Sequence, residues 1–236
     1  MGVAYNSNPP MDGIVLCFDA ANAKSYPGSG TTWNNLCERT GNATLINGPT
    51  YFSDFGGYIN FDGSNDYASV PSNTEYLLAS EFTMTAWVRP KNNPSNYGAI
   101  CGTFDFLPSS YYGFNFSILP NSQTFHFLVG GWNGGNINYI PASSTYNINQ
   151  WYHLVGTTNG LTSKFYVNGI LNTTYTQAAV AVPGSSTTQF LIGRYYQNVD
   201  NFYYVGDLAS TYLFNREFTA TEVKDTFNLQ KNRFGL

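Results

Sequence analysis

The sequence predicts an all-β protein, built as a two-sheet antiparallel sandwich or jelly roll and closed by one short C-terminal helix. Aromatic residues make up 17% of the 236 residues and charged residues only 10%, a profile typical of twisted sheets joined by turns. Short apolar segments alternate with turn residues along the whole chain, and no Gly/Pro-rich linker divides them. A chain of this length buries enough surface to fold without a disulfide or a metal.

The clearest local signal is residues 151–172, which predict a three-stranded antiparallel meander. Trp151, His153 and Val155 fall on one face of an extended segment, as expected for strand alternation. A polar turn at residues 159–163 leads to a second strand. Asn168-Gly169 then supplies the two positive-φ residues that a tight type I′ hairpin requires. The turns pin the register of this meander, which carries no catalytic group.

The remaining segments predict one domain over residues 13–236, preceded by an extended polar arm over residues 1–12. In residues 82–88, apolar and polar side chains alternate cleanly, and Pro90 stops that strand. A glycine-rich loop is expected at residues 130–135 and a low-complexity loop at 177–188. Further strands are predicted at residues 14–18, 44–46, 58–61, 67–70, 99–106, 112–119, 124–129, 137–140, 190–195 and 203–214.

The C-terminal segment predicts a helix. Thr219 and Glu222 have the spacing of a capping box, in which each side chain bonds the backbone of the other. Val223 and Phe227 lie four residues apart, so they share one face of the helix that should follow.

Charge and composition exclude several classes of function. The formal net charge is −4 with 10 Lys+Arg and no basic run, so we expect no nucleic-acid partner. No apolar run is long enough for membrane insertion, and residues 1–13 lack the pattern of a secretion signal. We therefore expect synthesis in a cytoplasm. The three cysteines, Cys17, Cys37 and Cys101, form no CxxC pair and are expected to be buried free thiols.

Taken in order, several segments resemble the laminin-G-like family of concanavalin A-like jelly rolls. The matching stretches are YINFDGSNDYASVP (58–71), FTMTAWVRP (82–90), the meander at 151–171, FLIGR (190–194) and GDLASTYLFNREFTATE (206–222). The resemblance implies a concanavalin A-like two-sheet jelly roll. Many relatives carry an Asp in the last strand, and related jelly rolls use that carboxylate to bind a structural calcium. Ala209 stands at that position here and cannot coordinate a cation.

The two ends of the chain resemble a narrower group, the stand-alone laminin-G-like proteins of marine and cyanobacterial bacteriophages. The stretches are GIVLCFDAANAKSYPGSGTTW (13–33) and FNLQKNRFGL (227–236). This resemblance implies a virion protein, made in the host cytoplasm and displayed on the virion surface. Its expected partners are other virion proteins, copies of itself and host-surface glycans. An extracellular location is the alternative.

Enzymatic chemistry has little support in the sequence. Glycoside hydrolysis needs two carboxylates flanking the scissile bond, but the 14 acidic residues are scattered and show no ExDxxE spacing. His126 and His153 lie inside strand patterns and are interpreted as sheet residues. We therefore expect no enzyme activity and no cofactor. A glycan lyase or hydrolase is the third hypothesis.

One turn is a weak calcium candidate. Asp62, Asn65 and Asp66 place three oxygen-bearing side chains within five residues, which suits calcium. The favoured interpretation is a hairpin turn whose Asp and Asn side chains bond their own backbone, without a metal.

Flat aromatic rings beside amides are the pattern that favours carbohydrate binding. Trp132, in the glycine-rich loop with Asn133 and Asn136, is the leading candidate. The other candidate sugar contacts are Tyr111, Tyr112, Tyr195 and Tyr196. Exposed aromatics also anchor protein interfaces. The leading hypothesis is therefore a non-enzymatic phage decoration or fibre protein with a lectin-like domain, and the alternative is a carbohydrate-binding lectin module without a capsid role.

Overall fold

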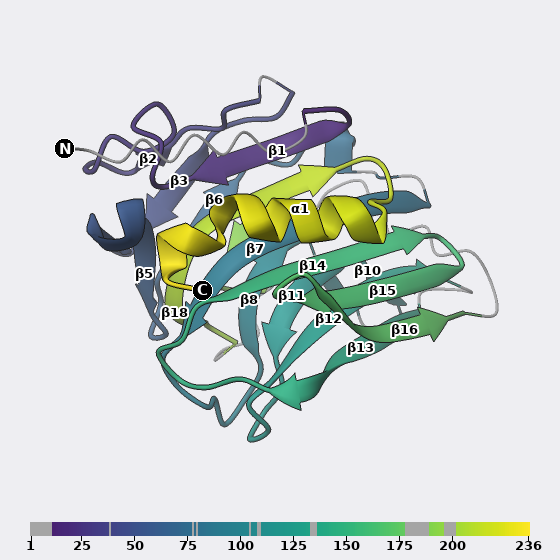
Figure 1. Cartoon of the computed structure of the whole chain (residues 1–236). Helices are drawn as coiled ribbons and strands as arrows, with labels where there is room; N and C mark the ends of the chain where they lie inside the picture. The colour runs from purple at the N-terminus through teal and green to yellow at the C-terminus, as the bar shows by residue number, and fades with distance from the viewer. Residues whose placement is uncertain are drawn as a thin grey trace.

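The computed structural model describes residues 11–37, 39–76, 78, 80–103, 105–107, 110–132, 136–177, 189–195 and 202–236. Within them, two antiparallel sheets stack face to face and one helix lies outside the stack (Figure 1). This arrangement confirms the predicted fold class. The predicted arm over residues 1–12 lies almost wholly outside the described residues.

The first sheet has β7 and β18 at its centre. Its order is β16 (Ile170–Thr176), β15 (Thr162–Val167), β14 (Tyr152–Asn159), β7 (Glu81–Pro90), β18 (Val205–Phe214), β5 (Tyr58–Asp62) and β4 (Thr50–Phe52), with β1 (Ile14–Asp19) also paired to β18. The meander predicted from residues 151–172 forms β14 to β16. Asn168 and Gly169 have φ of 52° and 75°, as the predicted hairpin turn requires.

The second sheet lies behind the first. Its order is β13 (Asn136–Thr145), β12 (Thr124–Trp132), β11 (Phe114–Ile118), β8 (Gly98–Gly102), β17 (Phe190–Ile192), β6 (Tyr67–Val70), β3 (Ala43–Ile46) and β2 (Thr32–Trp33). A separate hairpin, β9 (Asp105–Leu107) and β10 (Ser110–Tyr112), connects β8 to β11.

The main core fills the space between the sheets. Phe82 of the first sheet packs against Phe114 of the second with ring centroids 4.7 Å apart, and Phe165 packs against Phe116 at 5.8 Å. Met84, like Phe82, is fully buried in this core, so the predicted alternation in β7 is confirmed. Inward and outward side chains alternate along each strand, which identifies the residues on the two outer faces.

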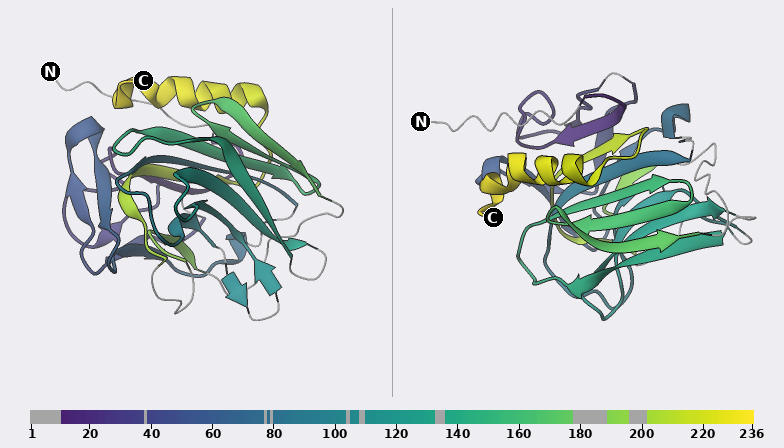
Figure 2. Two further views of the ribbon diagram at one scale, coloured as in Figure 1. Left: turned by 90° about the horizontal axis from the view of Figure 1, so that it is seen from below. Right: turned by 45° about the vertical axis from the view of Figure 1, so that its right-hand side comes forward.

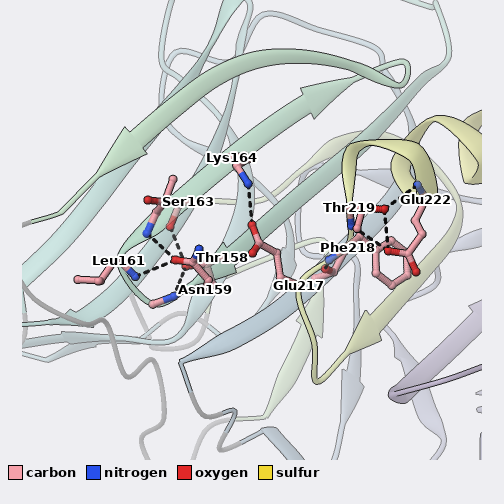
Figure 3. A network of polar contacts seen from close by, with 12 residues as sticks. Thr158, Asn159, Leu161, Ser163, Lys164, Glu217, Phe218, Thr219 and Glu222 are labelled. Atoms are coloured by element: carbon pink, nitrogen blue, oxygen red, sulfur yellow. Dashed lines mark hydrogen bonds and ion pairs between the residues drawn. The ribbon is translucent and has the colours of Figure 1, made fainter.

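Helix α1 (Ala220–Gln230) and the short 3-10 helix η3 (Lys231–Phe234) cover the outer face of the first sheet, as Figure 2 shows from two further directions. Phe234 of η3 stacks on Trp87 of β7 with ring centroids 4.1 Å apart. The predicted capping box is present: Thr219 accepts the Glu222 backbone N–H, and Glu222 accepts that of Thr219. Figure 3 shows this cap beside the ion pair between Lys164 and Glu217, which ties the segment before α1 to β15.

Several strand predictions were wrong in their limits. The strand predicted at 137–140 runs from Asn136 to Thr145, and the strand predicted at 190–195 ends at Ile192. The predicted strand at 99–106 is split into β8 and β9, because Gly102 adopts φ of 148° against the carbonyl of Phe114. The predicted strand at 112–119 begins instead at Phe114, after Gly113 turns the chain. The predicted loop at 130–135 is also shorter than expected: β12 continues to Trp132, and β13 begins at Asn136.

The three cysteines are free and buried, as predicted. Burial raises the pKa of the Cys17 and Cys101 thiols to about 12, so both stay protonated at neutral pH. Among the described residues, no helix combines the length and the apolar character needed to cross a membrane.

Candidate functional site

An open cavity of about 600 Å³ lies at the rim of the sandwich, where three segments distant in the sequence meet. The first segment is the turn between β5 and β6, the second is the loop between β7 and β8, and the third leads into β18. The residues that line the cavity are Gly63, Asn92, Pro94, Ser95, Asn96, Tyr97, Tyr203 and Val205.

The β5–β6 turn forms one wall because it packs closely on the start of β18. Gly63 adopts φ of 80°, and a Cβ there would lie 2.1 Å from the side chain of Val205. Asp62 Oδ1 accepts the Ser64 N–H at 2.8 Å, and Asp66 Oδ2 accepts the Asp62 N–H at 3.3 Å. Both carboxylates therefore accept hydrogen bonds from the backbone of their own turn.

The β7–β8 loop forms the opposite wall and is fixed at several points. Its first residue, Lys91, donates its N–H to the Val205 carbonyl at 3.0 Å, and the Asn92 carbonyl accepts from the Tyr146 hydroxyl at 2.8 Å. Asn96 Oδ1 accepts the Tyr97 N–H at 2.9 Å. The Asn92 Oδ1 atom is buried without a hydrogen-bond partner. Asn92 and Asn96 thus line the cavity from an anchored loop.

Two half-buried tyrosines supply the aromatic part of the lining. The Tyr97 ring packs edge-on against Phe202 with centroids 6.0 Å apart. The Tyr203 ring is held by Arg194, whose guanidinium carbon lies 5.6 Å from the Tyr203 centroid and 4.7 Å from that of Tyr67. These contacts fix the orientation of both rings before any ligand arrives, which lowers the entropic cost of binding.

The described lining residues are mostly aromatic, amide and hydroxyl groups. The eight lining residues include no ionisable acid or base other than the tyrosine hydroxyls. They therefore offer no pair of carboxylates for acid–base work on a glycosidic bond. Aromatic faces, amides and hydroxyls can instead stack on and hydrogen-bond to an uncharged ligand that carries many hydroxyl groups.

A buried charge cluster lies beside this site, and no sequence motif predicted it. Asp207 of β18 is fully buried and contacts Arg89 Nε at 2.6 Å and Lys91 Nζ at 2.9 Å. Asn60 Nδ2 donates to the same carboxylate at 2.8 Å. The Arg89 guanidinium carbon also lies 4.9 Å from the Tyr58 ring centroid. The cluster fixes the point where the β7–β8 loop leaves the sheet.

The predicted Trp132 site lies on strand ends rather than in a loop. Trp132 at the end of β12 pairs with Asn136 at the start of β13, and Asn133 lies outside the described residues. Tyr111 and Tyr112 belong to β10, which contacts both β12 and β13. Tyr112 is half-buried; the side chains of Trp132, Asn136 and Tyr111 are outside the description. Their sugar contact stays a prediction.

Tyr195 is placed differently from the exposed position expected of it. Its side chain is 3% exposed and packs with Ala99, Leu128 and Phe202. Its contact with a sugar stays a prediction. Tyr196 lies outside the described residues.

The turn at residues 62–66 holds the proposed calcium ligands. Asp62 and Asn65 are exposed, whereas Asp66 is 5% exposed. Burial raises the pKa of Asp66, with a further contribution from the nearby Asp62 carboxylate. Among the described residues, no three His, Cys, Asp or Glu side chains lie close enough together to hold a metal ion. Ala209 is buried beneath Phe234 and Trp151, in an apolar environment.

Both histidines are buried in the sheets, so the interpretation of them as sheet residues is confirmed. His153 stacks on Trp87 with centroids 4.9 Å apart and is 2% exposed. Burial lowers the pKa of His153 to about 3 and that of His126 to about 4. Both imidazoles are therefore neutral at pH 7.

Residues 62–224 match a family model described as the concanavalin A-like lectin/glucanases superfamily. No curated protein sequence matches the chain.

Solved structures with the same fold include two toxin domains and one enzyme. The binding domain of Paraclostridial mosquitocidal protein 1 has a TM-score of 0.71 at 16% identity, over 92% of this chain and 52% of that chain. The binding domain of botulinum neurotoxin serotype G has a TM-score of 0.68 at 17% identity, over 92% of this chain and 51% of that chain. Trypanosoma rangeli sialidase in complex with sialic acid has a TM-score of 0.68 at 17% identity, over 96% of this chain and 34% of that chain. The chain thus spans between a third and a half of these structures, and the likeness shows the fold.

Proposed function

Since the chain belongs to the concanavalin A-like lectin/glucanases superfamily, we propose that it is a non-enzymatic carbohydrate-binding domain. The proposed binding site is the rim cavity between the β5–β6 turn, the β7–β8 loop and the segment before β18. The observation that carries this proposal is the lining itself, in which two oriented tyrosines stand beside two asparagines and a serine.

The lining also suggests the class of sugar. Tyr97 and Tyr203 offer ring faces to the apolar C–H face of a pyranose, and Asn92 and Asn96 offer donors and acceptors to its hydroxyls. Because the described lining residues carry no carboxylate and no ammonium group, we propose a neutral glycan. Two of the structural neighbours are named as binding domains, and a third was solved in complex with sialic acid.

The test is a glycan array, run with calcium and again with a chelator. We expect binding of neutral glycans that survives the chelator, because the Asp62 and Asp66 carboxylates are already bonded to their own turn. Binding lost with the chelator would restore the calcium site at that turn. Release of reducing sugar from the bound glycans would contradict the non-enzymatic assignment.

Two pocket variants locate the site. Tyr97→Ala and Tyr203→Ala should each weaken binding at least tenfold, which corresponds to about 1.4 kcal/mol. Tyr175→Ala is the matched control, because Tyr175 lies on β16 and is already 37% exposed. Trp132→Ala tests the site first predicted from the sequence. Binding that is lost only in the Trp132 variant, with an unchanged melting temperature, would move the site to the end of β12.

A narrower role is proposed on the resemblance of residues 13–33 and 227–236 to phage proteins. In this role the domain is displayed on a virion, held by residues 1–12, by other virion proteins and by self-association, and contacts host-surface glycans. Peptides of the chain should then be found in purified phage particles. Their presence only in lysates would contradict the virion role and leave the extracellular lectin as the working assignment.

A further inference from the structure

On the outer face of the second sheet, Asn115 and His126 are buried polar side chains with atoms that lack hydrogen-bond partners. In β11, Phe114, Phe116 and Ile118 point into the core, so Asn115 points to the outer face. Asn115 is 1% exposed, and neither its Oδ1 nor its Nδ2 has a hydrogen-bond partner. His126 of β12 lies on the same face, is 3% exposed, and its Nδ1 also has no partner.

These two side chains are neighbours across the sheet. Asn115 pairs with Leu128 and Ser117 pairs with His126, so Asn115 and His126 are diagonal partners on adjacent strands. Such diagonal positions lie about 7–8 Å apart, a gap that one ligand group can bridge. Leaving a buried donor or acceptor unsatisfied costs about 1–3 kcal/mol. A ligand that both donates and accepts hydrogen bonds would satisfy the Asn115 Oδ1, Asn115 Nδ2 and His126 Nδ1 atoms together.

An exposed ring lies beside them. Tyr139 of β13 pairs with Leu128, is 43% exposed, and its ring lies 6.0 Å from that of His126. The flat ring and the amide repeat the chemistry of the rim cavity, and a neutral imidazole lies beside them. The His126 imidazole is neutral at pH 7, so it contributes no charge to these contacts.

Aromatic side chains connect this face to the rim cavity. Tyr97 lines the cavity and packs on Phe202, which packs in turn on Tyr195 with centroids 5.7 Å apart. Tyr195 packs against Leu128, the residue that pairs with Asn115. Neighbouring strands lie about 4.8 Å apart, so the two-strand step from β8 to His126 spans about 10 Å.

We propose that Asn115, His126 and Tyr139 form a second carbohydrate subsite, and that the ligand is an oligosaccharide of at least three rings that extends from the rim cavity across the second sheet. This inference rests on the proposed function and deepens it. Sugar hydroxyls suit the site because each one both donates and accepts, as the Asn115 amide and the His126 nitrogen require. Since both side chains are enclosed, the ligand displaces the side chains that cover them.

The experiment separates a ligand site from a structural defect. Asn115→Leu and His126→Phe remove the unpaired atoms and keep the volume, so the melting temperature should stay the same or rise. Affinity for the longest glycans bound on the array should fall at least tenfold, and affinity for mono- and disaccharides should not change. His153→Phe is the matched control, because His153 has the same unpaired Nδ1 and burial but lies beneath α1 on the other sheet.

Each outcome supports or overturns the second subsite. Weaker binding of long glycans in a variant that is as stable as the natural protein supports the second subsite. Unchanged binding of long glycans by both variants overturns it, and indicates that ordered water satisfies these atoms. If Tyr97→Ala still abolishes binding in that case, the proposed function stands without the second subsite. A natural protein that binds no glycan of any length overturns both.

Discussion

The buried carboxylate of Asp207 should dominate the stability of the rim. It is fully enclosed and neutralises Arg89 at 2.6 Å and Lys91 at 2.9 Å. The Arg89 side chain is only 16% exposed, so Asp207→Ala would leave a largely buried guanidinium without a counter-ion. Breaking a buried pair by removing one partner costs about 3–5 kcal/mol. At about 2–4 °C per kcal/mol for a protein of this size, the melting temperature should fall by about 6–20 °C.

Two comparisons make this prediction specific. Glu75 forms an exposed ion pair with Arg39 at 3.6 Å, and Glu75→Ala should cost no more than about 1 kcal/mol. A triple variant, Asp207→Leu with Arg89→Met and Lys91→Met, removes all three charges together and should regain much of the lost stability.

Chemical denaturation of these variants and the natural protein supplies the free energies. If Asp207→Ala changes the free energy of unfolding by less than about 1 kcal/mol, the carboxylate does not organise the rim and the reasoning fails. Because Lys91 begins the loop that lines the cavity, the single variant should also weaken glycan binding.

Three further perturbations test the packing. Both histidines have folded-state pKa values below the ordinary 6.5, at about 4 for His126 and about 3 for His153, so the unfolded chain binds the extra protons. The contribution of each neutral histidine to the free energy of unfolding is therefore fully present above pH 6.5. Below pH 6.5 it should fall by about 1.4 kcal/mol per pH unit for each histidine. Replacing both histidines by Phe should flatten the profile of melting temperature between pH 6.5 and 4.5, and an unchanged slope would contradict the assignment. Gly156→Ala would place a Cβ 2.6 Å from the Phe127 ring and should cost about 1–3 kcal/mol in urea unfolding, whereas a neutral effect would mean that the ring moves freely. Thr219→Ala removes the helix cap and should cost about 1 kcal/mol, with the loss visible as faster hydrogen exchange in the first turn of α1; equal exchange rates would show that the cap contributes nothing.

Local rules were sufficient for the elements whose structure is decided locally. Asn168-Gly169 forms its hairpin because only small or Asn-type residues tolerate two successive positive φ angles. Residues 82–88 form a strand because their alternation fits one buried face, and Thr219 with Glu222 caps the helix that follows. The order of such segments was enough to identify the fold.

The candidate site could not be predicted in the same way, because tertiary pairing assembles it. Gly63, Asn96 and Tyr203 are far apart in the sequence and meet only because β5, β7 and β18 are neighbours in the first sheet. In the sequence, Asp207 is one of 14 scattered acidic residues. Only the pairing of the strands places Arg89 beside it. Tyr195 has the sequence context of an exposed loop, but its burial depends on Leu128, which comes from another strand.

The measurement that tests the central claim most directly is hydrogen exchange of the protein with and without the tightest glycan found on the array. Proposed binding at the rim cavity predicts slower exchange in residues 91–97 and 202–205, the two segments that supply its amides and tyrosines. Slower exchange confined to the segment around Trp132, with residues 91–97 unchanged, would contradict the rim site and return the binding function to the end of β12.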